Sequence, residues 1–454
     1  MGMARKYKTA DYERTLGLKI SMRDVLAPEH LARFIVDMIA QLDLSGIYSQ
    51  YGDQGAPPYA PEVLLGLLFY GYATGVFSSR KIEKATYEVI PFRFIAGDMH
   101  PDHDTIAHFR QQFLAELKEL FVQMLLIAQE MGHLQLGNVS LDGSKIHADA
   151  SKSKAVSYGH LLVIEAHLQT EVNELFALAD ADEGGQLPQE MNITDEIERR
   201  EQQLKQLAEA KKVLEARAQA RYEAEQAEYE AKMQAREEKA AQKKHKPHGR
   251  APQPPTPGPR DQDQYNFTDP ESRIMKNANN SGFDQHYNVQ IVVDHDSRLI
   301  VGHWLCDHTN DQQAALPTID SVPPELGQSK AANLDAGYFS QSNINGLQAR
   351  GIDPYIATGR SSHHQGWRAY FTDNPDLPPE DASVKEKMAY KLRTAIGKAL
   401  YRLRKSTVEP VIGLIKEVLG FRQFSLRGLS ATGGEWTLVC LAYNLKRLHT
   451  LQIG

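Results

Sequence analysis

Three carboxylates in the sequence are candidates for binding metal ions. Asp142 lies in a predicted strand just before Gly143, and Asp335 ends a short apolar segment shortly before Gly337. The third, Glu409, is the only acid in the basic segment YRLRKSTVEPVIGLIK. Carboxylate oxygens are the hard ligands that Mg2+ and Mn2+ prefer, and two such ions can hold the attacking and leaving oxygens of a phosphodiester. Taken singly, each acid is explained more simply by a turn or a surface ion pair.

The segment around Glu409 is strongly basic within an acidic chain. Residues 384–428 hold eleven Lys or Arg and three acids, a local net charge of +8, whereas the whole chain carries −7. This asymmetry favours a phosphate-bearing partner. On an ideal helix three cations lie within about 40° of Glu409, namely Arg402, Lys405 and Lys416. Arg404 is expected on the far side, and Pro410 predicts a helix break beside Glu409.

The elements that must position these acids are predicted to alternate. Strands are expected at 138–147 (with a bulge or an end near Gly143), 287–294, 299–306, 331–335 and 354–357. Helices are expected at 311–319, 341–350, 385–419 and 435–449, and residues 1–135 are predicted to be helical, with helices at 62–72, 80–89 and 105–131. The second and third strands form a predicted hairpin. The resulting order matches an α/β fold with a ribonuclease-H-like mixed sheet.

A long polar segment interrupts this order after the first strand. Residues 161–246 are rich in Ala, Glu, Gln, Lys and Arg, which is typical of long helices or a coiled-coil hairpin. Lys211 interrupts the apolar seam, so an isolated, solvated helical arm is favoured over an interhelical zipper. A proline-rich linker follows, up to residue 260.

The composition narrows the class of protein further. Two cysteines exclude a disulfide scaffold and a cysteine-based zinc cluster, and fit a reducing compartment. The longest charge-free apolar run, residues 63–77, is too short to span a membrane, and the N-terminal residues lack the apolar core of a signal peptide. We therefore expect a cytoplasmic protein of bacterial type.

Several motifs, in order along the chain, are similar to those of one known family. They are YGYATGVFSSRKIEKA (70–85), PDHDTIAHFR (101–110), VSLDGSKIHADASK (139–152), NFTDPESRIMK (266–276), NLDAGYFS (333–340) and VEPVIGLIKEVLGFRQFSLRGL (408–429). Together they resemble the DDE transposases of bacterial insertion sequences, whose catalytic core is ribonuclease-H-like. The resemblance covers nearly the whole chain. It implies that the catalytic, metal-binding acids are Asp142, Asp335 and Glu409.

The resemblance also implies cofactors and partners. Two Mg2+ (or Mn2+) ions per active site would support cleavage at the ends of the element, and the freed 3′-OH would then attack target DNA. The implied partners are double-stranded DNA, as terminal inverted repeats and as target, and a second subunit in a homodimer, with a nucleoid-associated location. Expected DNA contacts near Glu409 are Tyr401, Arg402, Arg404, Lys405, Lys416 and Arg422. A candidate helix-turn-helix adds Arg80, Lys81 and Lys84, although a helical dimerisation domain explains that region equally well.

One spacing departs from the family pattern. A related third segment places Tyr, Arg, Glu and Lys with two, three and six residues between them. Arg404 keeps the spacing from Tyr401, whereas Lys405 keeps the spacing to Glu409, so either cation can take the role of the arginine. Fallback acids for the three positions are Asp149, Asp307 and Glu417.

We expect four segments. These are a helical DNA-binding or dimerisation domain at 1–135, the first part of the catalytic domain at 136–160, the helical insertion and linker at 161–260, and the rest of the catalytic domain at 261–454. Two other functions stay open. One is a catalytically inactive or domesticated DNA-binding protein derived from a transposase, and the other is a scaffold whose working part is the helical arm.

Overall fold

The computed structural model describes residues 7–14, 21–52, 57–181, 192–243, 251–277, 282–359, 377–379 and 381–454. The chain divides into two compact units, one formed by Met1–Asp149 with Glu271–Gly454 and the other by Ala150–Pro270. Within the described ranges, no helix combines the length and the apolar character needed to span a bilayer.

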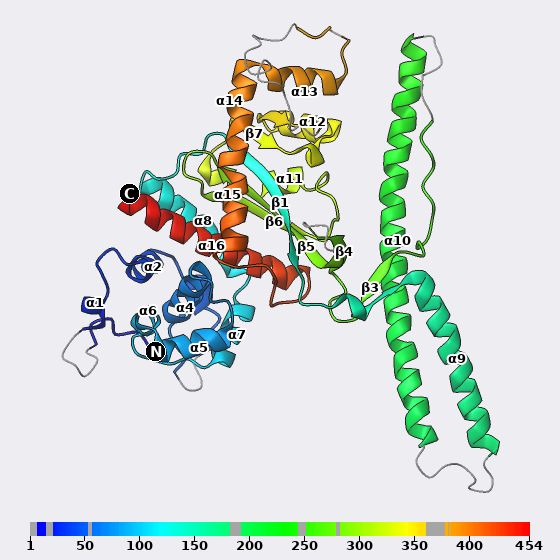
Figure 1. Cartoon of the computed structure of the whole chain (residues 1–454), viewed down its shortest axis with the longest axis horizontal. Helices are drawn as coiled ribbons and strands as arrows, with labels where there is room; N and C mark the ends of the chain where they lie inside the picture. Colours follow the sequence, from blue (N-terminus) through cyan, green and yellow to red (C-terminus); the bar gives the residue numbers. More distant parts are fainter. Residues whose placement is uncertain are drawn as a thin grey trace. The chain divides into compact units, whose positions relative to one another are not determined.

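A mixed β-sheet forms the centre of the first unit (Figure 1). In the described part of the chain its strands are β1 (Val139–His147), β4 (Arg273–Lys276), β5 (Phe283–Asp294), β6 (Ile300–Cys306), β7 (Ala331–Leu334) and β8 (Asp353–Ile356). β5 pairs antiparallel with β1 along one edge and with β6 and β4 along the other. β1 pairs parallel with β7, and β7 pairs parallel with β8. The predicted α/β class and the hairpin of β5 and β6 are confirmed.

β1 is an unbroken strand. All nine of its residues pair in continuous register with β5, so the bulge or strand end expected near Gly143 is wrong. A glycine is needed there for another reason, because Gln290 lies directly opposite and a Cβ on Gly143 would overlap the Gln290 amide. The sheet's irregularity lies in the hairpin instead, where the register shifts between Val292 and Val293 of β5 and the extra residue, Val301, lies on β6.

The C-terminal helix α16 (Leu429–Ile453) forms much of the core. Buried residues lie on all of its sides between Thr432 and Leu448, which is typical of a helix enclosed by other elements. It contacts β6 and also the helices α4 (Pro61–Ala73) and α8 (Glu116–Glu130). Two further helices, α11 (Ala315–Asp320) and α12 (Gln341–Ala349), connect β6, β7 and β8.

The N-terminal residues are helical, as predicted. Besides α4 and α8, the helices are α1 (Met22–Val25), α2 (Leu31–Ile39), α3 (Ser45–Tyr48), α5 (Ser79–Glu88), α6 (Ile90–Ile95) and α7 (His103–Gln112). The single helix expected at 105–131 is wrong, because the chain turns at Phe113 between α7 and α8. The two halves pack on different neighbours, since α7 contacts α4 and α5 whereas α8 contacts α16. Asp102 caps α7, its carboxylate accepting from the Thr105 amide at 2.7 Å.

The second unit is a helical hairpin with a small sheet. Helices α9 (Tyr158–Ala181) and α10 (Ile193–Lys243) accompany strands β2 (Ala155–Ser157) and β3 (Gln264–Asn266). Ion pairs of Glu171 with Arg200 and of Glu165 with Lys211 show that the helices run antiparallel. The isolated, solvated arm favoured from the sequence is therefore wrong. The helices pack through a buried cluster of Val156, Leu161, Leu207, Ala210 and Leu214.

Candidate active site

Asp142, within β1, and Asp335, just after β7, occupy corresponding positions of two neighbouring parallel strands. Ser140 of β1 pairs with Asn333 of β7, and each acid stands two residues further along its strand direction. Asp335 directly follows β7, and its carboxylate accepts a hydrogen bond from the first amide of a 3-10 turn. Carboxyl ends of parallel strands are where α/β sheets bind ligands.

Glu409 reaches the same place through a break in the preceding helices. The helix expected at 385–419 is divided into α13 (Val384–Arg393), α14 (Ala395–Leu403), a 3-10 turn (Arg404–Ser406), α15 (Val408–Gly413) and a π-helical turn (Leu414–Val418). The chain leaves the helix at Thr407, with φ −113° and ψ −81°. Pro410 follows in the first turn of α15, where proline is tolerated. The break therefore occurs ahead of the proline rather than at it.

One guanidinium joins the three acids. Arg404 Nη1 lies 2.9 Å from Asp142 Oδ2, and Arg404 Nη2 lies 2.9 Å from Glu409 Oε1 and 3.9 Å from Asp335 Oδ2. The Arg404 side chain is only 11% exposed, and its contact with Asp142, which is 19% exposed, is the most shielded of the three, whereas Glu409 and Asp335 are 43% and 51% exposed. The expectation that Arg404 lies on the far side from Glu409 is wrong, because the break at Thr407 interrupts the regular helix. Lys405, the alternative cation, is exposed.

The electrostatics of Asp142 reflect its crowded surroundings. Burial raises the pKa of Asp142 to about 6, the charges of Asp335 and Asp311 add to the shift, and Arg404 opposes it. The phenol of Tyr401 lies beside Arg404, and burial raises its pKa as well. The cluster thus holds more carboxylate charge than one guanidinium neutralises.

The donor set fits a hard divalent cation. Among the residues that the structure describes, no three His, Cys, Asp or Glu side chains converge closely enough to hold a metal ion. The acids surround the guanidinium instead, with one positive charge against the three negative charges of Asp142, Asp335 and Glu409. Oxygen donors with excess negative charge suit Mg2+ or Mn2+. Asp142, Asp335 and Glu409 would hold such an ion.

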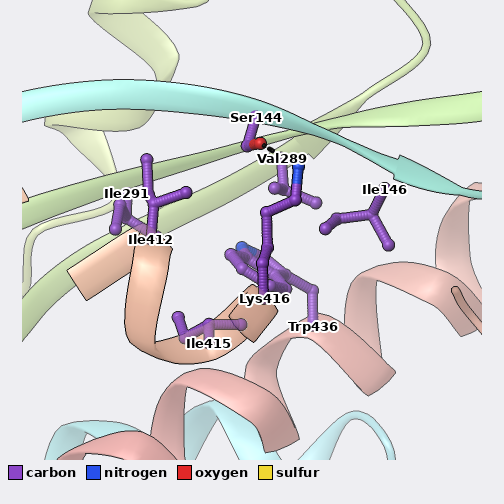
Figure 2. A pocket seen from close by; sticks show the side chains of 8 residues that line it. All are labelled: Ser144, Ile146, Val289, Ile291, Ile412, Ile415, Lys416 and Trp436. Atoms are coloured by element: carbon purple, nitrogen blue, oxygen red, sulfur yellow. Dashed lines mark hydrogen bonds between the residues drawn. The ribbon is translucent and has the colours of Figure 1, made fainter. Parts of the chain in front are cut away.

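Lys416 is half-buried and turned toward the sheet rather than exposed on the basic surface. Its Nζ donates to Ser144 Oγ at 3.0 Å and to the Lys145 carbonyl at 3.3 Å, and Figure 2 shows the side chain rising toward β1. Burial lowers the pKa of Lys416. The small cavity around its stem is lined by apolar side chains, among them Ile412, Ile415 and Trp436. Lys416 therefore ties the π-helical turn to β1, close to Asp142.

The other predicted cations lie at the surface. Arg402 is exposed on α14, and Arg422 is exposed and pairs with Glu417. On α5 the three expected DNA contacts, Arg80, Lys81 and Lys84, are all exposed. Lys84 also pairs with Glu88 at 3.7 Å.

The fallback acids are engaged elsewhere. Asp149 pairs with Arg427 at 2.8 Å, and Asp307 pairs with Arg273. Glu417 pairs with Arg422. Each fallback acid therefore has its own cation, whereas Asp142, Asp335 and Glu409 share Arg404.

Asp311, the first residue of the helix expected at 311–319, is a neighbour of the site. Its Oδ1 accepts from Asn288 Nδ2 at 2.8 Å and from Gln290 Nε2 at 2.9 Å. Tyr338 donates its hydroxyl to the same Gln290 side chain. The signal available in the sequence was the alternation of polar Asn288 and Gln290 within an apolar strand.

The fold is α/β with a mixed sheet, and at the candidate site three carboxylates gather around one guanidinium. Two family models match the chain, Transposase domain (DUF772) over residues 20–112 and Transposase DDE domain over residues 254–445. The chain belongs to the DDE-type transposases of insertion sequences, enzymes that cleave DNA and transfer its strands.

The matched DDE domain includes two of the three candidate acids. Asp335 and Glu409 lie within the matched DDE domain, and Asp142 precedes it. Dependence on a divalent metal ion is general in this family. No curated protein and no solved structure matches the chain.

Proposed function

We propose that Asp142, Asp335 and Glu409 are the catalytic acids of this transposase and hold two Mg2+ (or Mn2+) ions. The enzyme would cut the phosphodiester at the ends of its element and join the freed 3′-OH to target DNA. The observation that carries this proposal is the contact of all three acids with the single guanidinium of Arg404. Asp142 and Asp335, far apart in the chain, thus share one cation.

The chain's own groups contribute position and charge. Bound divalent ions would supply Lewis-acid activation of the attacking oxygen and stabilisation of the leaving oxygen. Asp142 would hold its ion from a fixed position within β1, because every residue of that strand pairs with β5 and its first two residues also pair with β7. Glu409 would close the site from the helical side, where its side chain is 43% exposed and accessible to DNA. Arg404 would balance the acids' charge and contact a phosphate when ions replace it.

We infer a ribonuclease-H-like arrangement for the sheet. Two antiparallel pairings, β6 with β5 and β5 with β1, are followed by two parallel pairings toward β7 and β8. This pattern supports the inference, as does the helical unit that follows β1. The segment boundaries 1–135, 136–160, 161–260 and 261–454 remain part of the proposal.

DNA is the partner of the family, and we propose which residues contact it. Near the acids, the exposed Arg402, Lys405 and Arg422 would bind phosphates, with Tyr401 beside Arg404. On α5, Arg80, Lys81 and Lys84 would contact the terminal inverted repeats. A homodimer would bring the two ends of the element together.

Substitution of each acid tests the proposal. Asp142→Asn, Asp335→Asn and Glu409→Gln should each abolish nicking of a terminal-repeat duplex in Mg2+ or Mn2+ while leaving duplex binding intact. Asp320→Asn is the matched control, because Asp320 is 51% exposed like Asp335 and also pairs with an arginine, Arg350. Undiminished nicking by any of the three acid variants would remove that residue from the catalytic set.

A further inference from the structure

Each proposed catalytic acid is preceded, two positions earlier, by a buried polar residue. The exposed fractions of these residues are 0%, 1% and 2%. They come from a strand, a second strand and a helix break, so no common periodicity explains the equal spacing. The residues are Ser140 before Asp142, Asn333 before Asp335 and Thr407 before Glu409.

These three side chains meet in one network through His295. Ser140 Oγ lies 2.9 Å from His295 Nε2, and Asn333 Nδ2 lies 3.3 Å from the same nitrogen. Thr407 Oγ1 lies 3.1 Å from Ser140 Oγ. His295 stands in the turn between β5 and β6, so the network joins four separate parts of the first unit.

The hydrogen-bond directions are consistent with a neutral imidazole. Asn333 Nδ2 can only donate, so His295 Nε2 accepts from it and from the Ser140 hydroxyl. Because Ser140 gives its hydrogen to His295, Thr407 is the donor toward the Ser140 oxygen, and it shares its one hydroxyl hydrogen between that oxygen and the Leu403 carbonyl. Burial lowers the pKa of His295, in agreement with an unprotonated Nε2.

The network also fixes the helices that bring Glu409 and Arg404 to the site. Asn333 Nδ2 donates to the Leu400 carbonyl of α14 at 2.7 Å. Thr407 Oγ1 lies 2.8 Å from the Leu403 carbonyl, at the end of the same helix. The break at Thr407 is therefore anchored to β1 and β7, beside the positions from which Asp142 and Asp335 extend.

We propose that Ser140, His295, Asn333 and Thr407 are positioning residues that set the separation of the three acids and so the affinity for the divalent ions. This inference rests on the proposed catalytic set. Loss of one hydroxyl would let the helix break shift relative to the strands. Residues that orient metal ligands typically change metal affinity or activity by about 10- to 100-fold when removed.

The test compares variants in the full-length chain. Thr407→Val removes the hydroxyl with little change of shape, and Thr407→Ser keeps it. Thr318→Val is the matched control, because Thr318 is 0% exposed and its hydroxyl donates to the Ala314 carbonyl at 2.6 Å, outside the network. The measurements are Mn2+ binding by calorimetry without DNA, kcat and KM on a terminal-repeat duplex, and the thermal midpoint.

The network predicts a specific pattern. Thr407→Val should bind Mn2+ about tenfold or more weakly and lose kcat by a similar factor with KM for DNA unchanged. Thr407→Ser should restore both. Equal Mn2+ affinity and kcat in Thr407→Val and Thr318→Val would overturn the proposal, since a purely structural hydroxyl lowers only the thermal midpoint.

Two further variants distinguish a failure of the positioning role from a failure of the proposed catalytic set. Ser140→Ala removes the other end of the Thr407 hydrogen bond, and it replaces Thr407→Val in the same comparison if that variant does not fold. Asp142→Asn tests the proposed catalytic set itself, through its Mn2+ binding. If it binds Mn2+ like the unmodified protein, the catalytic set is wrong; if it loses Mn2+ while Thr407→Val and Ser140→Ala do not, only the positioning role is wrong.

Discussion

Arg404 and Asp142 are 262 positions apart in the chain, and the guanidinium of one lies 2.9 Å from the carboxylate of the other. The same guanidinium contacts Glu409 and Asp335. An arginine therefore supplies the positive charge around which the acids gather. Divalent ions binding to these acids would compete with it, and this competition can be measured.

Replacing Arg404 should destabilise the metal-free protein. In Arg404→Met the buried Asp142 loses its counter-ion and repels its neighbouring acids, so the free energy of unfolding should fall by about 1–3 kcal/mol. Urea unfolding in EDTA measures this loss. Adding Mg2+ should recover more stability in Arg404→Met than in the unmodified protein, because the ions then carry the missing charge.

The control for this substitution is Arg350→Met. Arg350 pairs with the half-exposed Asp320, so its loss should cost less than about 1 kcal/mol and be insensitive to Mg2+. If both variants lose the same stability and respond alike to Mg2+, Arg404 does not stand in for a metal ion.

The exposed cations near Glu409 should change the salt dependence of DNA binding. Arg402→Ala and Lys405→Ala should each reduce the slope of log K against log salt by about 0.9 if each side chain binds one duplex phosphate. Lys330→Ala serves as control, because Lys330 is also exposed but precedes β7 at the end opposite Asp335. Fluorescence anisotropy at several salt concentrations gives the slopes. An unchanged slope for Arg402→Ala or Lys405→Ala would remove that residue from the interface.

His286 should make folding sensitive to mild acid. It is 2% exposed in β5, against the ring of His147, and burial lowers its pKa from 6.5 to about 4. Above pH 6.5 the ring is neutral in both the folded and the unfolded chain, so it contributes no pH dependence. Between pH 6.5 and 4 only the unfolded chain takes up the proton, and folding should lose up to about 3 kcal/mol from this group.

A variant without a titratable ring at position 286 tests this pH dependence of stability. His286→Gln should flatten the dependence of unfolding free energy on pH between 6.5 and 4, measured by urea unfolding at a series of pH values. Equal pH dependence in the two proteins would mean that the imidazole is protonated in the folded state.

Much of the fold could be predicted from local pattern. The hairpin of β5 and β6 and the strand β7 follow from apolar runs bounded by turn residues, and α4 follows from Pro61 and the apolar residues behind it. The errors occurred where packing decides. The helix expected at 105–131 is interrupted at Phe113, because α7 and α8 pack on different neighbours. Gly143 is required by the Gln290 side chain that lies over it rather than by a bulge.

The candidate acids could be named from the sequence only through its resemblance to a known family, because each carboxylate taken singly is explained more simply by a turn or a surface ion pair. The sequence, through its resemblance to a known family, thus determined the class of enzyme and the candidates Asp142, Asp335 and Glu409, and its local patterns predicted the described strands of the sheet except β4. Tertiary structure alone decided that Arg404 rather than Lys405 meets these acids, that Lys416 is turned inward, and that a buried network links the three segments. Helical periodicity cannot foresee a break such as that at Thr407, which is held by a hydrogen bond to Ser140 of β1, 267 positions away.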